Sequence, residues 1–282
     1  MTTPIDTSRQ TDRTKTFRQM HDRGCWVIPN PWDVGSARLL EQMGFRALAS
    51  TSSGFAWTIG RRDNHITLDQ CLDWLRTLCA SVDVPVNADF EGGFAIAPAE
   101  VGANVGRAVQ TGVSGLSIED STGNASEPLF DRTLAVERVK AARRAIDDSG
   151  TGVLLTGRSE GFIAGRPDLD ETIRRLTAYA DAGADCLYAP GIKSPSDISA
   201  IVKAVAPKPV NVLVSGSFTT VSELAELGVR RISVGGALAR VAWGAVFKAA
   251  REIHELGTFS GFSSAATSGE IEGAVSRPRP SS

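Results

Sequence analysis

Long apolar runs are missing from this 282-residue sequence, and their absence excludes a membrane-spanning protein. A helix that crosses a bilayer needs about 20 consecutive, mostly apolar residues, and no stretch of the chain reaches that length. The stretch from Met1 to Lys15 is polar and lacks the apolar centre of a secretory signal. We therefore expect a cytoplasmic protein with no membrane partner.

Cysteine and histidine are also scarce, which argues against a zinc site. The four cysteines, at positions 25, 71, 79 and 186, match no zinc-ligand spacing, and the three histidines are scattered. We expect free, buried thiols of the kind found in cytosolic proteins. The net charge is −2 and the isoelectric point is about 6.0, so no nucleic-acid partner is expected.

The sequence does contain one repeated theme: an apolar strand, a polar or glycine turn, and an amphipathic helix. With 42% hydrophobic and 22% charged residues, the composition is that of an ordinary soluble domain. The length suits two domains or one large α/β barrel. Strands are predicted at 25–29, 46–50, 84–88, 115–118, 152–156, 184–188, 209–214 and 231–234. Helices are predicted between and after them at 36–43, 68–81, 99–111, 132–148, 169–182, 195–205, 220–227 and 237–256.

Eight strands, each followed by a helix, predict a single (β/α)8 TIM barrel of the α/β class. The strands are short and almost wholly apolar, as expected of parallel strands buried on both faces. An open doubly wound sheet is the alternative, but it favours a glycine-rich turn after the first strand, and that turn is absent. We expect the barrel over 16–256, after a disordered N-terminus at 1–15 and a helix from about Thr14. Residues 257–282 are predicted to be a mobile tail or an arm that docks on a neighbour.

The third predicted strand runs into acidic residues and two glycines. Side chains alternate along a strand, so Asn87, Asp89 and Glu91 are expected to point the same way. One amide and two carboxylates at a strand end are the oxygen ligands that a hard cation such as Mg²⁺ prefers. A polar strand end without a ligand is the alternative interpretation.

Polar residues gather at the C-terminal ends of the other strands as well, where TIM barrels carry their chemistry. These residues are Asn30, Asp33, Thr51, Ser52, Ser53, Glu119, Asp120, Arg158, Glu160, Asn211, Ser215 and Ser217. Clustered carboxylates with one arginine suggest a metal ion and an anionic substrate, since the carboxylates repel one another without a cation. Arg158 would then bind a substrate carboxylate or phosphoryl group. An internal ion pair with Glu160 or Glu119 is the alternative for this arginine.

One motif points to different chemistry. Residues 157–161 (GRSEG) match the G-x-S-x-G pattern of serine hydrolases, and His254 lies downstream. Such short patterns arise by chance in a chain with 28 glycines, and no good helix begins directly after Gly161. The strand count favours the barrel over a hydrolase.

Taken in order, these stretches resemble the isocitrate lyase / phosphoenolpyruvate mutase superfamily over about residues 16–256. The resemblance is carried by residues 50–53 (STSS), 60–63 (GRRD), 87–89 (NAD), 115–120 (GLSIED), 157–165 (GRSEGFIAG) and 182–185 (AGAD). It implies an eight-stranded barrel in a homo-oligomer, a tetramer or a dimer, with a C-terminal helix exchanged between subunits. It also implies a bound Mg²⁺, with Mn²⁺ as the other candidate.

The resemblance also implies roles for individual residues. Asp89 and Glu119 match metal-binding acids, Asp63 matches an acid on the loop after strand 2, and Arg158 matches the substrate-contacting arginine. Thr51, Ser52 and Ser53 stand where the oxo-acid is bound, and Asn211 stands among polar substrate contacts on strand 7. Catalysis is expected from Arg158, Asp63 and Glu119.

Three departures from the superfamily pattern narrow the activity. Asn87 replaces the first acid of the D-x-D pair, a direct metal ligand, and Glu91 is expected to supply the missing charge. The lyases' Lys-Lys-Cys-Gly-His loop is replaced by residues 121–128 (STGNASEP), which contain no cysteine, lysine or histidine. That argues against isocitrate or methylisocitrate cleavage, and Asn124 is only a partial match to the mutase loop. Ala189 replaces a histidine of some mutases.

The sequence thus predicts a Mg²⁺-dependent enzyme that breaks or forms a C–C or P–C bond beside the carbonyl of a small α-oxo or 2-hydroxy carboxylate. A pyruvate enolate is the expected intermediate. Ser121, Thr122, Gly123 and Asn124 are expected to form a lid. Two alternatives remain: a metal-free phosphate-binding barrel that uses Gly216 and Gly235-Gly236, and a non-catalytic binding protein of the same fold.

Overall fold

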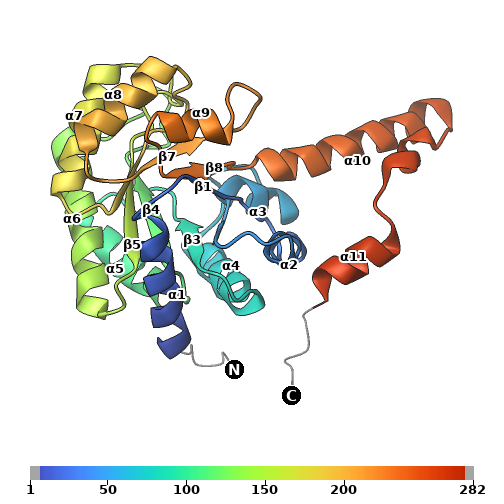
Figure 1. Cartoon of the computed structure of the whole chain (residues 1–282), viewed down its shortest axis with the longest axis horizontal. Coiled ribbons are helices and arrows are strands. Elements are labelled where there is room, and N and C mark those ends of the chain that lie inside the picture. The colour runs from blue at the N-terminus through green and yellow to red at the C-terminus, as the bar shows by residue number, and fades with distance from the viewer. Residues whose placement is uncertain (1–6, 277–282) are drawn as a thin grey trace.

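The computed structural model describes residues 7–276, and within them eight parallel strands form one sheet (Figure 1). The strands are β1 (Trp26–Ile28), β2 (Leu48–Ala49), β3 (Val86–Asp89), β4 (Gly115–Glu119), β5 (Leu154–Arg158), β6 (Cys186–Tyr188), β7 (Val210–Leu213) and β8 (Arg231–Ser233). Their order is β1-β8-β7-β6-β5-β4-β3-β2, with sequential neighbours side by side. Because β1 also pairs with β8, the sheet curves into a nearly closed (β/α)8 barrel, and the predicted fold is confirmed.

The barrel closes between β1 and β2 through hydrogen bonds rather than through a full ladder. The backbone N–H of Ala49 donates to the Pro29 carbonyl at 3.0 Å. Asn30, just beyond β1, donates through Nδ2 to the Ser50 carbonyl at 3.0 Å and accepts from the Val234 N–H at 2.9 Å. Asn30 therefore ties three strand ends together, and its amide is used for closure.

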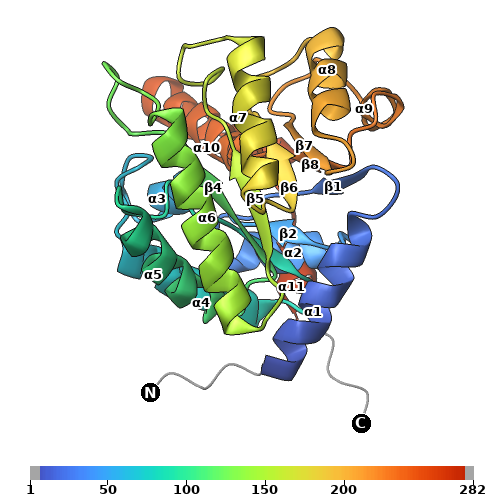
Figure 2. The ribbon, with the colours of Figure 1, turned by 90° about the vertical axis from the view of Figure 1, so that its left-hand side faces the viewer.

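Helices surround the strands (Figures 1 and 2). They are α1 (Thr7–Met20), α2 (Val34–Gln42), α3 (Ser52–Thr58), α4 (Leu68–Ser81), α5 (Pro98–Val109), α6 (Arg132–Ser149), α7 (Leu169–Asp181), α8 (Pro195–Val205), α9 (Val221–Glu226), α10 (Ala237–Leu256) and α11 (Ser268–Val275). Asp33, expected at the site, is the N-cap of α2, where its Oδ1 accepts from the Ser36 N–H at 2.7 Å. None of the helices in the range 7–276 is long and apolar enough to cross a bilayer.

Two apolar clusters stabilise the barrel. The larger lies between strands and helices, where the α4 side chains Leu72, Leu75 and Leu78 are fully buried. The smaller closes the N-terminal end of the barrel, where Phe17 of α1 packs with Ile28 and neighbours from β2 and β5. Both follow from the same cause, which is the removal of apolar side chains from water at an interface between elements.

Helix α1 begins at Thr7 and not near Thr14, so the expected start of this helix was wrong. Polar contacts explain why hydrophobic periodicity missed its first turns. Gln10 donates to the carbonyls of Val109 and Val113 at 2.8 and 2.9 Å, and Arg13 donates to the Cys79 carbonyl at 3.0 Å. The first two turns thus pair with backbone groups at the base of the barrel. Residues 1–6 lie outside the described residues.

The C-terminal region leaves the barrel and returns to it (Figure 1). Helix α10 projects away, and Ala239 is its only buried residue. A short 3₁₀ helix (Ser260–Ser264) follows, and α11 lies beside α2, where Arg38 donates to the Val275 carbonyl at 3.2 Å. The expected tail thus contains ordered helix that packs on its own chain as far as residue 276; residues 277–282 lie outside the described range.

Candidate active site

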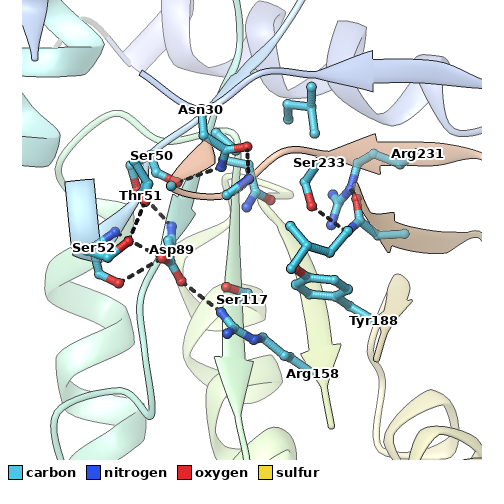
Figure 3. Close-up of a pocket in the computed structure, with 18 of the residues that line it drawn as sticks. Asn30, Ser50, Thr51, Ser52, Asp89, Ser117, Arg158, Tyr188, Arg231 and Ser233 are labelled. Atoms are coloured by element: carbon cyan, nitrogen blue, oxygen red, sulfur yellow. Dashed lines mark hydrogen bonds and ion pairs between the residues drawn. The ribbon is translucent and has the colours of Figure 1, made fainter. Parts of the chain in front are cut away.

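A cavity of about 160 Å³ opens at the C-terminal ends of the strands and extends into the barrel (Figure 3). Its wall combines loop residues after β1 and β2 with inward-facing side chains of β3 to β8. It is lined by Ile28, Asn30, Ala49, Ser50, Thr51, Ser52, Ser53, Asp63, Asn87, Asp89, Ser117, Arg158, Tyr188, Asn211, Leu213, Arg231, Ser233, Gly235 and Gly236. TIM-barrel interiors are usually filled with bulky branched side chains, so this polar interior marks a binding site.

The rim after β2 holds Asp89 in place. Ser52 donates to Asp89 Oδ2 twice, from its backbone N–H at 3.0 Å and from its hydroxyl at 2.9 Å. The Asp89 N–H donates to Ser50 Oγ at 2.9 Å. Thr51 is the N-cap of the short helix α3, and its hydroxyl shares a hydrogen bond of 3.1 Å with that of Ser53. The structure thus brings together the hydroxyl-bearing residues and the carboxylate that the sequence pointed to.

Arg158 lies at the centre of the acidic residues. Its Nη1 is 3.2 Å from both Asp89 Oδ1 and Glu119 Oε2, and its Nε contacts Glu160. Its guanidinium also lies 5.3 Å from the centre of the Tyr188 ring, within cation–π range. The internal ion pair considered for Arg158 is therefore present, and it joins three carboxylates on three strands or their ends.

Burial and neighbouring opposite charges shift the pKa values of this cluster in opposite directions. Burial raises the pKa of Glu119 well above its usual range, although Arg158 acts to lower it, and the pKa of Glu160 is raised for the same reason. Burial alone would lower the pKa of Arg158, but Glu160 and Glu119 hold it well above its usual range. Asp63 has a raised pKa, first through burial and then through repulsion by Asp89. Glu119, Glu160 and Asp63 therefore all hold their protons more strongly than exposed carboxyl groups do.

Glu160 is itself positioned from the outer layer of the barrel. Its backbone N–H donates to Asp120 Oδ1 at 2.8 Å. The other carboxylate oxygen of Asp120 accepts from the Tyr179 hydroxyl at 2.6 Å and from Arg175 at 3.1 Å. Both of these residues belong to α7, so Asp120 connects this helix to the loop that carries the acidic partner of Arg158.

Glu91 does not lie beside Asp89 in the way strand alternation predicted. Strand β3 ends at Asp89, and the Glu91 backbone turns with φ of 47°. Its side chain lines a second cavity of about 300 Å³, shared with Glu119 and the loop residues Ser121, Thr122 and Gly123. Burial, followed by repulsion from Asp89 and Asp63, raises the pKa of Glu91 to about 8. The alternation failed because β3 ends at Asp89, two residues before Glu91, and the backbone turns there.

Asn87 faces the cavity, but its amide points toward the neighbouring strand. Its Nδ2 donates to the Ala88 carbonyl at 3.2 Å, and its Oδ1 is buried without a hydrogen-bond partner among the described residues. A Cβ on Gly115 of β4 would lie only 2.6 Å from that oxygen. Glycine at position 115 thus provides the space that the Asn87 side chain occupies.

The expected metal ligands do not form a site for a directly bound ion in this arrangement. Asp89 and Glu119 have oxygens of the right chemistry for Mg²⁺, but Arg158 and Ser52 already engage Asp89, and Arg158 also engages Glu119. Among residues 7–276 no three Asp, Glu, His or Cys side chains are grouped so that they could hold a metal. The orphaned oxygens of Asn87 and Glu91 line different cavities. Arg158 occupies the position that a cation between the acids would take.

Comparison with known proteins identifies the family. The family described as phosphoenolpyruvate phosphomutase matches residues 17–254, which is most of the chain. The chain belongs to the phosphoenolpyruvate phosphomutase family. It is therefore an enzyme of the isocitrate lyase / phosphoenolpyruvate mutase superfamily, and the resemblance inferred from its motifs is confirmed.

Two sequence relatives and one solved structure show what this phosphomutase-family chain is similar to. It is 31% identical over 223 residues to the uncharacterized protein Rv1998c of Mycobacterium tuberculosis, covering 78% of this chain and 81% of that protein. It is 29% identical over 239 residues to oxaloacetate decarboxylase of Paraburkholderia xenovorans, covering 80% and 76%. A crystal structure from Burkholderia cenocepacia, described only as a candidate lyase/mutase, shares 46% identity with a TM-score of 0.91, covering 94% and 96%.

The structure also places the remaining predicted residues: the loop after β4, Asn211 and the G-x-S-x-G motif. In the loop Ser121–Asn124 the first two residues are half-buried and the last two are exposed, and a bridge between Ser121 and Leu129 closes it. Both polar atoms of Asn211 are engaged by the protein: Oδ1 accepts from Arg231 and Nδ2 donates to Ser233, each at 2.9 Å. In the G-x-S-x-G motif, Ser159 is 1% exposed, whereas His254 lies on the projecting helix α10. That motif forms no nucleophile–base pair.

Sequence reasoning missed several lining residues of this site, among them the polar residues Ser117, Tyr188, Arg231 and Ser233. Alternation gave a usable signal for two of them. Ser117 lies two residues before Glu119, and Ser233 lies two residues after Arg231, so each pair faces the same side. A charged residue inside an apolar strand was the signal for Arg231.

Proposed function

We propose that this chain is a lyase that breaks the C–C bond next to the carbonyl of a small α-oxo or 2-hydroxy carboxylate through a pyruvate enolate. Oxaloacetate is the first substrate to test. The observation that carries this proposal is the polar cavity, in which Ser52, Asp89 and Arg158 meet inside a phosphomutase-family barrel. Support comes from relatives named oxaloacetate decarboxylase and from a loop at 121–128 that has no cysteine.

In this mechanism the β2–α3 rim and Arg158 bind the oxo-acid end of the substrate. The hydroxyls of Thr51 and Ser53 face the cavity with hydrogen-bonding capacity for a carboxylate. Positive charge near the developing enolate stabilises it, and one such preorganised donor is worth about 3–4 kcal/mol in comparable enzymes. Arg158 supplies this charge when its contacts shift from Asp89 toward the substrate.

Asp63 is the proposed proton donor. It lines the cavity, and burial raises the pKa of its carboxyl, so Asp63 holds a proton more readily than an exposed aspartate does. When CO₂ leaves oxaloacetate, the electron pair of the broken bond remains on the enolate, and Asp63 gives its proton to that carbon. The resulting carboxylate is reprotonated from water. Asp63 thus serves as the acid, a role that no side chain of the loop Ser121–Asn124 can fill. That loop instead covers the second cavity as a lid.

Two further features complete the proposal. The projecting helix α10 exposes Val241, Trp243, Val246 and Phe247, so we propose that it packs on a second copy in a homodimer or homotetramer. Mg²⁺ and Mn²⁺ are the ions to test, although no step above depends on them. An ion that binds between Asp89 and Glu119 must displace Arg158.

Product analysis tests the function. The full-length protein is incubated with oxaloacetate, phosphonopyruvate or methylisocitrate, each with Mg²⁺, with Mn²⁺ and with a chelator. We expect oxaloacetate to give pyruvate and CO₂, with activity reduced at least 100-fold in Arg158→Gln and in Asp63→Asn. Arg132→Gln is the matched control, since Arg132 pairs with Glu171 on the surface.

Other outcomes would redirect the assignment. Acetate and oxalate as products would indicate hydrolysis in place of decarboxylation. Turnover of phosphonopyruvate alone would indicate a mutase-type enzyme. No turnover with any substrate, together with no heat of binding for oxalate, would contradict the proposal and leave a binding protein of the same fold.

A further inference from the structure

A second arginine lies deeper in the cavity than Arg158. Arg231 is the first residue of β8, is 3% exposed, and lines the same cavity. Its Nη2 donates to Thr156 Oγ1 at 3.0 Å. Thr156 precedes Arg158 by two residues on β5, so both face the barrel interior. Two residues of strand span about 6–7 Å, so the two arginine side chains meet the cavity in successive layers.

The two arginines differ in their partners. Arg158 contacts three carboxylates. Arg231 has only uncharged partners: Nε donates to Asn211 Oδ1 at 2.9 Å, Nη2 donates to Thr156, and Nη1 lies 3.3 Å from His21 Nε2. Among residues 7–276 no acid lies within ion-pair distance of Arg231. It is the basic residue of the cavity wall whose charge no protein carboxylate balances.

His21 does not add charge to this group. Its Nδ1 lies 2.8 Å from the Phe17 carbonyl, so the ring proton is on Nδ1 and Nε2 accepts from Arg231. Burial, with repulsion from Arg231, lowers the pKa of His21 to about 3. Asp185 does not balance Arg231 either, because its carboxylate is paired with Arg18 and Arg143. The positive charge at the base of the cavity is therefore uncompensated.

A buried cation without a counter-charge is costly, and an anion in the adjoining cavity would offset that cost. The cavity of about 160 Å³ is smaller than the roughly 300–1,000 Å³ of drug-sized pockets, so the ligand is small. The spacing of the two layers is comparable with the distance between the carboxylates of a four-carbon diacid. One carboxylate could lie at the rim near Ser52 and Arg158 while the other reaches Arg231.

We propose that Arg231 binds the second carboxylate of the substrate and makes the site selective for four-carbon dicarboxylates over monocarboxylates. This inference rests on the proposed function, because it assigns the substrate class of the same cavity. It makes Arg231 a specificity-determining residue, whereas Asn211 and Thr156 hold its guanidinium in place.

Equilibrium binding tests the proposal without requiring turnover. Malate and 2-hydroxybutyrate carry the same 2-hydroxy acid group, and differ in a carboxylate or a methyl group at the far carbon. By calorimetry on the full-length protein, we expect malate to bind at least tenfold more tightly than 2-hydroxybutyrate. In Arg231→Gln the preference should fall to threefold or less, and in Arg231→Lys it should persist. Arg230→Gln is the matched control, since Arg230 is the adjacent arginine and contacts the Gly24 carbonyl outside the cavity.

Several results would overturn the inference. These are an unchanged preference in Arg231→Gln, an equal loss of affinity for both acids, or no preference in the wild-type protein. If Arg231→Gln does not fold, a wild-type crystal soaked with malate decides the matter. A carboxylate within hydrogen-bond distance of Arg231 supports the proposal, and both carboxylates at the rim refute it. A failure to cleave oxaloacetate would count against the proposed function alone, since these readouts measure binding.

Discussion

Replacing Arg158 with glutamine should destabilise the protein strongly, and more so at alkaline pH. The change removes the cation shared by Asp89, Glu119 and Glu160. Removing one partner of a buried ion pair costs about 3–5 kcal/mol, because the remaining charge is left uncompensated. Here three carboxylates lose their partner, so we expect a loss at the upper end of that range at pH 8.

Protonation should reduce the loss at lower pH. Glu119 and Glu160 already have pKa values above the ordinary 4.5 of glutamate, and removing Arg158 raises them further. Above pH 4.5 the unfolded chain releases these protons while the folded protein keeps them. Stability is therefore retained at low pH and falls as pH rises toward the folded-state pKa values. The destabilisation at pH 8 should exceed that at pH 5.5 by at least about 1.4 kcal/mol, the equivalent of one pKa unit.

Urea denaturation followed by tryptophan fluorescence measures both quantities, in chelator-containing buffer at the two pH values. Arg132→Gln is the control, because its exposed pair with Glu171 should contribute no more than about 1 kcal/mol. In the double variant Arg158→Gln/Glu160→Gln, part of the lost stability should return. Equal losses at pH 5.5 and pH 8, or a loss below about 1 kcal/mol, would refute the argument that Arg158 balances buried carboxylates.

Three other predictions follow from single residues. Because the pKa of Glu91 is raised to about 8 in the folded protein, wild-type stability should fall from pH 5 to pH 8. In thermal melts, Glu91→Gln should make stability depend less on pH over this range. An unchanged pH dependence would contradict the buried position of Glu91. Gly115→Ala should lower the free energy of unfolding by about 1–3 kcal/mol, because the added Cβ would collide with Asn87. Gly106→Ala is the control: it lies in open space on α5 and should raise the free energy of unfolding by about 0.5–1 kcal/mol. Equal effects of the two changes in urea titrations would argue against the close approach of Gly115 to Asn87. Ser52→Ala should lower the free energy of unfolding by about 1.5–3 kcal/mol, because the hydrogen bond from the Ser52 hydroxyl to the Asp89 carboxylate is lost. An unchanged urea midpoint would show that this bond does not form in solution.

The barrel could be predicted because its signals are local. Apolar strands and amphipathic helices alternate through the chain, and the strand ends bring Ser52, Asp89 and Arg158 to one cavity whatever the details of the loops. The importance of Arg158 was also visible, since it is a lone arginine at a strand end that faces acids. What the sequence left open was its partner, and the structure places three carboxylates there.

The missed features depend on contacts between distant segments. Glu91 turned away because β3 stops two residues earlier, which alternation alone does not reveal. The early start of α1 depends on Gln10 and its carbonyl partners, which are 99 and 103 residues later in the chain. The surroundings of Arg231 come from β5, β7 and His21, the residue that follows α1, so its lack of an acidic partner can be recognised only in three dimensions.

The contact network of Asp120 implies that the outside of the molecule can control its reaction centre. A change at Tyr179 or Arg175 on α7 alters nothing that a substrate touches, yet it loosens the carboxylate that fixes the Glu160 backbone. Random mutagenesis screened for activity should therefore recover impaired variants on that peripheral helix. Substitutions on α7 therefore offer a way to change the activity of the enzyme without altering the cavity wall.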